Sequence, residues 1–453
     1  MAEKTIAAVA TPAGQGALGV IRISGEKAFD IADKVFFPFS RKPLKDLKGY
    51  SAAYGQVKNG DTVLDDGVAL VFRAPLSFTG EDTVEITLHG GSLMLRSVLR
   101  LIFEKGASPA EPGEFTKRAF LNGKTDLTRA ESIMGLISAK SDVELRLSRA
   151  AHLGKTAEKI EKIIADLTKA DAAISVFSDY PDEDIEGLDK DGFSAMLLNC
   201  KTALEEMLRT FEAGKILRDG IETVIVGKPN VGKSTLMNML SGADRSIVTD
   251  VAGTTRDVIE ETVKIGDVIL RLADTAGIRN TDDAVESIGV ELAKKRIDSA
   301  QLILAVFDCT EEFTEDDRLL LESVRGRNTI IIINKTDLKS KLDPSVFKGF
   351  SKVEISAKEN TGYNELCSTI AEISGTANLS PDSAVLINER QRDCASKALN
   401  SVNEAYCALL DGNTFDAVGI CVDDALSQLF NLTGQRVTNE VADEIFRNFC
   451  VGK

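Results

Sequence analysis

The chain has 453 residues, 43% hydrophobic and 27% charged, a composition typical of a water-soluble protein with about two to four domains. No apolar run is long enough to cross a bilayer and no signal peptide is recognisable, so we expect no membrane contact. Seven cysteines without C-x-x-C pairs favour a reducing, cytoplasmic location over a disulfide framework, and a formal net charge of −16 disfavours broad electrostatic binding to nucleic acid.

The first part of the chain alternates short apolar runs with Gly and Pro, which predicts an N-terminal α+β domain over residues 1–120. The expected strands are TIAAVA, ALGVIRIS, DDGVALVFRAP and DTVEITLHG. Each run has the length of a strand and is bounded by turn residues.

Helical spacing follows and predicts the first part of a helical domain over residues 121–217. Apolar residues form one stripe within Leu127–Ile137 and another within Ile160–Leu167. Pro181 and the acidic residues after it interrupt the helices. A further amphipathic stretch, Met196–Phe211, leads into GKILRDG, which we interpret as a helix end and a linker.

A phosphate-binding loop, GKPNVGKS, follows the apolar run Ile221–Val226 in a predicted GTPase domain over residues 218–376. Its glycines let backbone N–H groups fold around phosphates, which also meet the positive end of the next helix. We expect Lys233 to bridge the β- and γ-phosphates and the Ser234 hydroxyl to ligate Mg²⁺.

Four more motifs follow in the order of a guanine-nucleotide hydrolase: AGTTRD, DTAG after VILRLA, NKTD after TIIII, and SAK after KVEI. Thr255 is the expected second hydroxyl ligand of Mg²⁺, and Asp274 completes the shell from the end of its strand. The Asp337 carboxylate can accept two hydrogen bonds from guanine that adenine cannot offer. These strand-length apolar runs indicate a buried parallel sheet.

All five motifs contribute to the predicted GTP site. Its residues are Asn230, Val231, Gly232, Lys233, Ser234, Thr235, Thr249, Asp250, Val251, Ala252, Gly253, Thr254, Thr255, Asp274, Thr275, Ala276, Gly277, Asn334, Lys335, Thr336, Asp337, Ser356, Ala357 and Lys358.

Helical periodicity resumes after the GTPase domain and predicts the second part of the helical domain over residues 377–453, ending in CVGK. The expected helices are Asn388–Leu410, Ala417–Leu432 and Asn439–Phe449. Since two helical blocks flank the GTPase domain, the economical topology is one helical domain with the GTPase inserted into it.

Blocks outside the GTPase motifs resemble the MnmE (TrmE) family of tRNA-modification GTPases, which are potassium-activated and of the TRAFAC class. The blocks are ATPAGQGALGVIRISG, SFTGEDTVEITLHGG, PGEFTKRAFLNGKTDL and the terminal FCVGK, and the resemblance covers the whole chain. It implies an N-terminal α+β domain for folate binding and dimerisation, a helical domain, and an inserted Ras-like doubly wound α/β GTPase domain.

The resemblance also implies a homodimer that joins the FAD-dependent flavoprotein MnmG in a heterotetramer or larger complex acting on tRNA. A carboxymethylaminomethyl or aminomethyl group is added to C5 of the wobble uridine, with the one-carbon unit taken from 5-formyltetrahydrofolate or a related tetrahydrofolate. Cys450 carries over as a residue for the modification chemistry. The folate contacts fall on Arg22, Glu85, Lys124 and Lys453.

In this family K⁺ takes the place of an arginine finger when two GTPase domains meet, and oxygen-only coordination suits that ion. The resemblance gives the K⁺ ligands as Asn230, Thr249, Val251 and Thr254. It assigns the positioning of water to Glu286, so the expected catalytic residues are Glu286, Lys233 and Thr255.

Two other functions stay open. A regulatory GTPase switch in ribosome or RNA assembly would carry the same AGTTRD and DTAG motifs, but it would not need the first-domain blocks or CVGK. A folate-dependent transferase with GTP as an allosteric ligand would need redox chemistry from a partner, because the sequence has no evident flavin or nicotinamide fingerprint.

Overall fold

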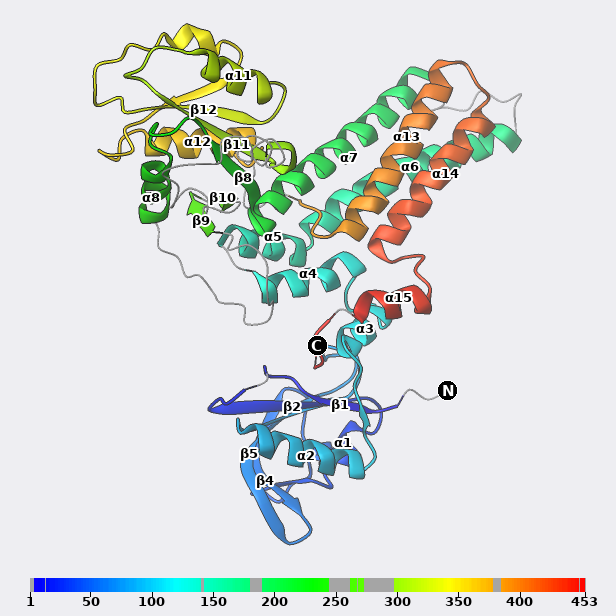
Figure 1. Ribbon diagram of the computed structural model, residues 1–453. Coiled ribbons are helices and arrows are strands. Elements are labelled where there is room, and N and C mark those ends of the chain that lie inside the picture. Colours follow the sequence, from blue (N-terminus) through cyan, green and yellow to red (C-terminus); the bar gives the residue numbers. More distant parts are fainter. Residues whose placement is uncertain are drawn as a thin grey trace. The chain divides into compact units, whose positions relative to one another are not determined.

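The computed structural model in Figure 1 describes residues 4–12, 14–139, 142–179, 190–243, 261–266, 268–272, 297–377, 384–447 and 449–452. The chain divides into two compact units, each described by itself. Unit 1 contains Met1–Met134, His152–Lys201 and Asp393–Lys453, and unit 2 contains Gly135–Ala151 and Thr202–Arg392. Within the described ranges, no helix is both long enough and apolar enough to cross a membrane.

Unit 1 begins with a seven-stranded sheet in the order β3-β4-β5-β6-β2-β1-β7, in which all neighbours are antiparallel except β1 and β7. The four predicted strands correspond to β1, β2, β5 and β6, and β4 is an additional strand that pairs with β5. The bounds are β1 Ile6–Val9, β2 Leu18–Ser24, β3 Phe36–Pro38, β4 Ser51–Asn59, β5 Thr62–Phe72, β6 Thr83–His89 and β7 Ser108–Pro109.

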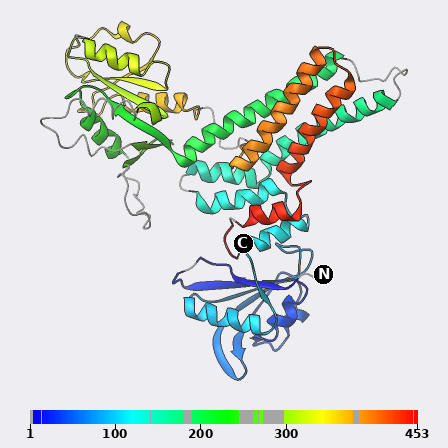
Figure 2. The same cartoon turned by 45° about the vertical axis from the view of Figure 1, so that its right-hand side comes forward.

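Long helices make up most of the rest of unit 1, and α4, α7 and α13 continue into unit 2. Figures 1 and 2 show α6, α13 and α14 running alongside one another. The bounds are α1 Ala28–Ala32, the short 3₁₀ helix Leu44–Asp46, α2 Ser92–Glu104, α3 Glu114–Leu121, α4 Leu127–Ser138, α6 Lys155–Asp179, α7 Lys190–Asp219, α13 Glu389–Leu410, α14 Phe415–Thr433 and α15 Asn439–Phe446.

Alternating side chains give the seven-stranded sheet an apolar face and a more polar face. Ile21 on β2 and Ile86 on β6 are fully buried in a core that includes residues of α1 and α2. Arg22 and Glu85 are the residues next to Ile21 and Ile86 along these strands, and they pair directly with each other across the two strands. Because successive side chains of a strand point to opposite faces, this charged pair lies on the face away from that core.

The predicted linker GKILRDG is wrong, because α7 continues through this segment to Asp219. Leu217 is buried, and a side chain at Gly214 would press against Val385, so Gly214 permits a close contact with the segment that precedes α13. The helix ends instead at Gly220, whose φ of 78° is accessible to glycine.

Unit 2 is built around a six-stranded sheet in the order β13-β12-β11-β8-β10-β9, parallel except for the pair β9 and β10. The direction of strand succession reverses at β8, and ligands of doubly wound sheets bind at such a switch point. The bounds are β8 Ile221–Val226, β9 Glu261–Ile265, β10 Val268–Leu272, β11 Leu302–Asp308, β12 Thr329–Asn334, β13 Ser351–Glu354, α5 Asp142–His152, α8 Lys233–Ala243, α11 Glu315–Ser323, the short 3₁₀ helix Pro344–Phe347, and α12 Tyr363–Ile373.

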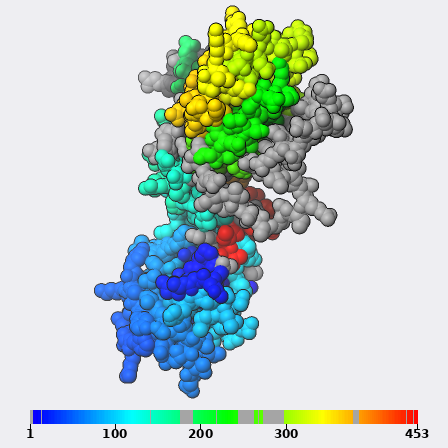
Figure 3. All heavy atoms as spheres, turned by 60° about the vertical axis from the view of Figure 1, so that its left-hand side comes forward, coloured from blue at the N-terminus to red at the C-terminus, as the bar shows by residue number. Residues whose placement is uncertain are grey.

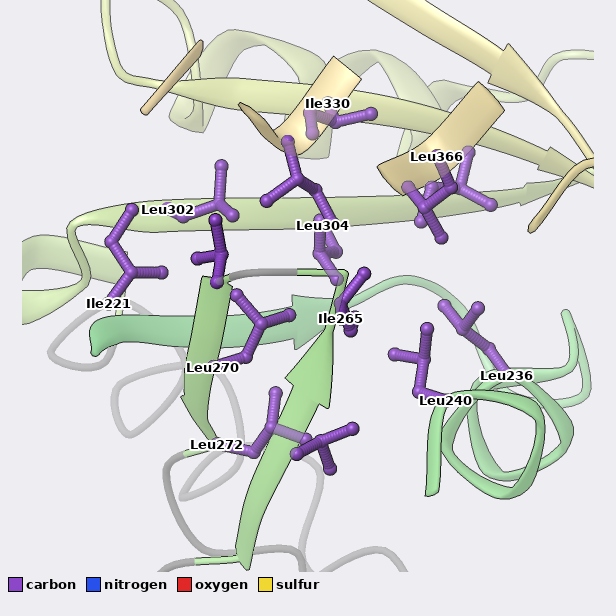
Figure 4. Close-up of a cluster of buried hydrophobic side chains, with 14 of the residues drawn as sticks. Ile221, Leu236, Leu240, Ile265, Leu270, Leu272, Leu302, Leu304, Ile330 and Leu366 are labelled. Atoms are coloured by element: carbon purple, nitrogen blue, oxygen red, sulfur yellow. The ribbon is translucent and has the colours of Figure 1, made fainter. Parts of the chain in front are cut away.

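Both faces of this sheet are buried, as the continuous apolar runs predict. Every residue of β11 and β12 is buried. Figure 4 shows Leu302 and Leu304 of β11 in one core with Leu236 of α8 and Leu366 of α12. The alternate β11 residues belong to a second core that includes Leu321 of α11. The predicted doubly wound α/β architecture is therefore confirmed.

Leu304→Ala should lower the free energy of unfolding of unit 2 by about 3 kcal/mol, because the fully buried Leu304 would leave a cavity. Native-state hydrogen exchange at the β11 and β12 amides measures this change. Leu319→Ala is the control, since the Leu319 side chain is 55% exposed and its loss should alter stability by less than about 0.5 kcal/mol. Equal protection in the two variants would contradict the packing described for β11.

Candidate functional site

The phosphate-binding loop joins β8 to α8 in a conformation that requires glycine at two positions. Gly227 and Gly232 have φ values of 152° and 98°. A Cβ on Gly227 would lie 2.5 Å from the Val306 carbonyl oxygen, and one on Gly232 would collide with the Asn334 side chain. The loop therefore packs directly against β11 and the NKTD segment.

The Lys233 ammonium group lies over this loop. It donates hydrogen bonds to the carbonyl oxygens of Gly227 at 2.7 Å and Lys228 at 2.5 Å. Burial lowers the pKa of Lys233, since the charged form is partly removed from water. A phosphate would restore a favourable partner for this charge. Ser234 and Thr235 follow in the first turn of α8, and both are exposed.

Asn334 connects three of the predicted motifs. Its Nδ2 donates to the Val231 carbonyl oxygen at 2.9 Å, and its Oδ1 accepts from the Ala357 N–H at 3.1 Å. Asn334 itself is 2% exposed. The adjacent Lys335 donates from Nζ to the Asn230 carbonyl oxygen at 2.9 Å. The phosphate loop, NKTD and SAK are thus joined by side-chain hydrogen bonds.

The Asp337 carboxylate is exposed and oriented by the SAK segment. The Ser356 hydroxyl donates to Asp337 Oδ1 at 2.6 Å and accepts from the Glu359 N–H at 3.2 Å. Thr336 donates its N–H to the Ile355 carbonyl oxygen, which holds the loop against the end of β13. A carboxylate fixed in this way can accept paired N–H groups from one edge of a base.

Asp308 is part of the site and was missed by the sequence analysis. Its Oδ2 lies 2.5 Å from Lys335 Nζ, and its Oδ1 accepts from the Thr310 N–H and hydroxyl at 2.9 and 2.7 Å. Burial raises the pKa of Asp308, but the hydrogen bonds from Lys335 and Thr310 outweigh it and leave that pKa below its ordinary value. The signal was available, because Asp308 ends the apolar run of β11 at the same sheet edge.

A second missed contact holds the phosphate loop to α11. Lys228 Nζ lies 2.5 Å from both Asp317 Oδ2 and the Thr314 hydroxyl. Thr314 and Asp317 form the capping box of α11. The T-E-D-D pattern at the start of α11 predicts a capped helix, but it does not indicate which loop contacts that cap.

Several predicted site residues lie outside the described residues. Lys358 is described and exposed, whereas no residue of the AGTTRD and DTAG motifs is described, nor is the glutamate predicted to position water. The residues concerned are Thr249, Asp250, Val251, Ala252, Gly253, Thr254, Thr255, Asp274, Thr275, Ala276, Gly277, Glu286 and Lys453.

The charged pair of the first domain meets the C-terminal segment within unit 1. Arg22 Nε lies 2.7 Å from Glu85 Oε1, and Arg22 Nη1 donates to the Gly452 carbonyl oxygen at 3.4 Å. Lys124, predicted for the same site, donates from Nζ to the Pro75 carbonyl oxygen at 3.0 Å. Three of the four predicted folate contacts are therefore described, and two of them touch directly.

Cys450 is exposed on the segment that carries Gly452. The Gly113 N–H donates to the Cys450 carbonyl oxygen at 3.3 Å. Gly452 has a φ of 95°, and a Cβ there would collide with the Val9 carbonyl oxygen. In Figure 3 the red atoms of the C-terminal segment lie against the blue atoms of the N-terminal residues. The chain end is thus attached beside Arg22 by its backbone.

A doubly wound sheet with a phosphate-binding loop, NKTD and SAK gathered at one edge defines the class of guanine-nucleotide hydrolases. The family model for the MnmE helical domain matches residues 127–450, and the model for the GTP-binding protein TrmE N-terminus matches residues 5–124. The chain belongs to the MnmE family of tRNA modification GTPases.

Similarity to individual relatives extends over the whole chain. The tRNA modification GTPase MnmE of Clostridioides difficile is 40% identical over 456 residues, which cover 100% of this chain and 99% of the relative. The MnmE of Lactococcus lactis is 41% identical over 455 residues, which cover 99% and 98% of the two chains. The predicted family membership and GTPase class are confirmed.

Gly232→Ala should weaken GTP binding at least tenfold, because the added methyl group would displace Asn334 and the positive φ would be strained. Calorimetric titration with a non-hydrolysable GTP analogue measures the effect. Gly242→Ala on α8 is the matched control, since no atom lies within 4 Å of the added Cβ. Unchanged affinity in the Gly232 variant would contradict the close approach of loop and Asn334.

Proposed function

We propose that this chain is a potassium-dependent GTPase, activated when two nucleotide domains dimerise, that works with the FAD-dependent protein MnmG to modify the wobble uridine of certain tRNAs. The observation that carries the GTPase proposal is the joining of the phosphate-binding loop to NKTD and SAK through Asn334. The names of the full-length relatives support the tRNA part. Seven free thiols agree with a reducing cytoplasm.

The proposed division of labour follows the four chain segments. Residues 1–120 bind folate and form the homodimer, residues 121–217 and 377–453 form the helical domain, and residues 218–376 bind and hydrolyse GTP. The homodimer joins MnmG in a heterotetramer or larger complex, and this complex acts on tRNA. Folate bound to residues 1–120 takes part in the modification, and GTP hydrolysis in residues 218–376 drives the conformational change of the complex.

Mg²⁺ suits the described end of the proposed metal site. The Ser234 hydroxyl is exposed at the start of α8 and has no hydrogen-bond partner among the described residues. It would ligate Mg²⁺ together with Thr255, while Lys233 neutralises charge on the phosphates. Glu286 would position the attacking water. When bound, Mg²⁺ would supply positive charge that stabilises the phosphates during hydrolysis.

Asn230 fits the proposed K⁺ site. Its backbone has a φ of 62°, its carbonyl oxygen accepts from Lys335, and the residue is exposed. The side-chain amide oxygen is therefore available to a cation placed against the phosphates. Thr249, Val251 and Thr254 would supply the other oxygens. A shell made of oxygen atoms alone suits K⁺, because hard cations prefer oxygen ligands.

The chemistry around Arg22 suits a reduced folate. Glu85 offers a carboxylate that can accept N–H groups from a pterin edge, and the side chains of Arg22 and Lys124 offer cationic donors for carboxylates. Lys453 would add a second ammonium group at the chain end. Folate would supply the one-carbon unit, and these residues would bind and orient it.

Asp337→Asn should weaken GTP binding by about two orders of magnitude and improve binding of xanthosine triphosphate, because the amide inverts the donor and acceptor pattern. Titration with both nucleotides measures the change in selectivity. Asp316→Asn, in the first turn of α11, removes an equally negative side chain outside the site and should bind GTP normally. Retained GTP preference in the Asp337 variant would remove this residue from base recognition.

Replacing K⁺ with Na⁺ should lower the rate of GTP hydrolysis by at least about tenfold while changing nucleotide affinity little, since the cation stabilises charge that grows in the transition state. Steady-state hydrolysis in KCl and NaCl at equal ionic strength tests this. Asn230→Ala should reduce the rate ratio between the salts, whereas Asn238→Ala, exposed on α8, should preserve it. Equal wild-type rates in the two salts would exclude the potassium mechanism.

Mass spectrometry of tRNA wobble uridines tests the tRNA role and separates it from a ribosome-assembly switch. A deletion strain should lack the modified uridine, and Cys450→Ser should fail to restore it while GTP hydrolysis persists. Cys407→Ser is the control, since Cys407 is also an exposed thiol and lies on α13. Normal uridines in the deletion strain would favour the assembly switch, and full rescue by Cys450→Ser would leave that thiol without a chemical role.

A further inference from the structure

Phe78 is an exposed aromatic residue on the loop between β5 and β6, next to the proposed folate site. It is 42% exposed, and the Arg22 guanidinium lies 5.3 Å from its ring centroid. Single exposed apolar side chains are common on protein surfaces. Phe78 differs because hydrogen bonds hold its neighbours Ser77 and Thr79 in place.

The residues flanking Phe78 are fixed by hydrogen bonds on both sides. The Ser77 hydroxyl donates to the Glu81 carbonyl oxygen at 2.5 Å. Thr79 is fully buried, its hydroxyl lies 2.7 Å from the Ser24 hydroxyl, and its carbonyl oxygen accepts from Asn122 Nδ2 at 2.7 Å. The ring of Phe78 is therefore presented to solvent by a loop anchored to β2 and to the end of α3.

A buried ion pair lies beneath this loop. Arg118 is 5% exposed, its Nη1 donates to both carboxylate oxygens of Glu81 at 3.1 Å, and its Nη2 contacts Glu114 at 2.7 Å. The Ser24 hydroxyl donates to Glu81 Oε2 at 2.7 Å. Burying charges has a large desolvation cost, so such a pair is better explained by the geometry that it specifies than by added stability.

The groups around Phe78 indicate what its ring would contact. Glu85 and the Gly452 carbonyl oxygen are acceptors bonded to Arg22, whose guanidinium lies 5.3 Å from the Phe78 ring centroid. A 2-amino-4-oxo pterin offers N–H donors on one edge and a flat π face, and aromatic rings associate by offset stacking. We infer that Phe78 is the stacking surface for the pterin ring of a reduced folate, an inference that rests on the folate binding proposed above.

The absence of tryptophan from the sequence allows a direct spectroscopic test in the full-length protein. Phe78→Trp introduces a single indole, whose emission should be quenched saturably by 5-formyltetrahydrofolate. Phe39→Trp is the matched control, since Phe39 is 55% exposed in the same domain and its ring centroid lies 5.1 Å from that of Tyr54 in a tilted arrangement. Its emission should not change with the same ligand beyond the absorbance correction.

Calorimetry provides the second measurement. Phe78→Leu should bind 5-formyltetrahydrofolate about five- to tenfold more weakly than wild type, while Phe78→Tyr should stay within about threefold. Affinity for p-aminobenzoylglutamate, which lacks the pterin, and the rate of GTP hydrolysis should be unchanged in both variants. These readouts separate loss of stacking from misfolding.

The outcomes distinguish this inference from the proposal on which it rests. If wild type binds no 5-formyltetrahydrofolate, both the folate role and the stacking role are wrong. If wild type binds it while Phe78→Leu binds equally well, or while Phe78→Trp emission is unaffected, folate binding stands and the role of Phe78 is overturned.

Discussion

The nucleotide site depends on the side-chain amide of Asn334. This one group donates to the phosphate-binding loop at Val231 and accepts from SAK at Ala357, and both bonds are buried. Leaving such groups unpaired costs about 1–3 kcal/mol each, so the amide strongly favours one arrangement of three loops that are far apart in sequence. Gly232 is required for the same reason, because any side chain there would occupy the position of the amide.

The ion pair between Asp308 and Lys335 extends this network to the end of β11. Lys335 also donates to the Asn230 carbonyl oxygen, so the NKTD segment shares a hydrogen-bond network with the proposed potassium ligand. Within unit 1 an analogous constraint acts on the chain end, where Arg22 and the Gly113 N–H bind the backbone of the segment that carries Cys450. In both units a glycine with positive φ, Gly232 or Gly452, lets another segment of the chain pack directly against its backbone.

The sequence predicts that the phosphate-binding loop, NKTD and SAK lie close together. Each motif follows an apolar run of strand length, and the carboxyl ends of parallel strands lie at the same edge of a sheet. The prediction of a linker at Gly214 was wrong. Glycine inside a helix costs about 1 kcal/mol of stability, and the burial of neighbouring side chains such as Leu217 outweighs this cost. The pairing of Lys228 with Asp317 depends on tertiary contact that no local pattern encodes. The proposed folate contacts rest on family resemblance alone, since an isolated Arg22 or Glu85 is indistinguishable from a surface charge.

The Asn334 side chain holds the phosphate-binding loop, NKTD and SAK together. Hydrogen exchange of the Ala357 amide in the nucleotide-free protein tests it most directly, with the Ile331 amide in β12 as internal reference. In wild type the Ala357 amide should be protected, and Asn334→Ala should accelerate its exchange at least about tenfold without changing Ile331, in proportion to the lost hydrogen bond. Equal Ala357 exchange in wild type and Asn334→Ala would contradict this role of the Asn334 side chain.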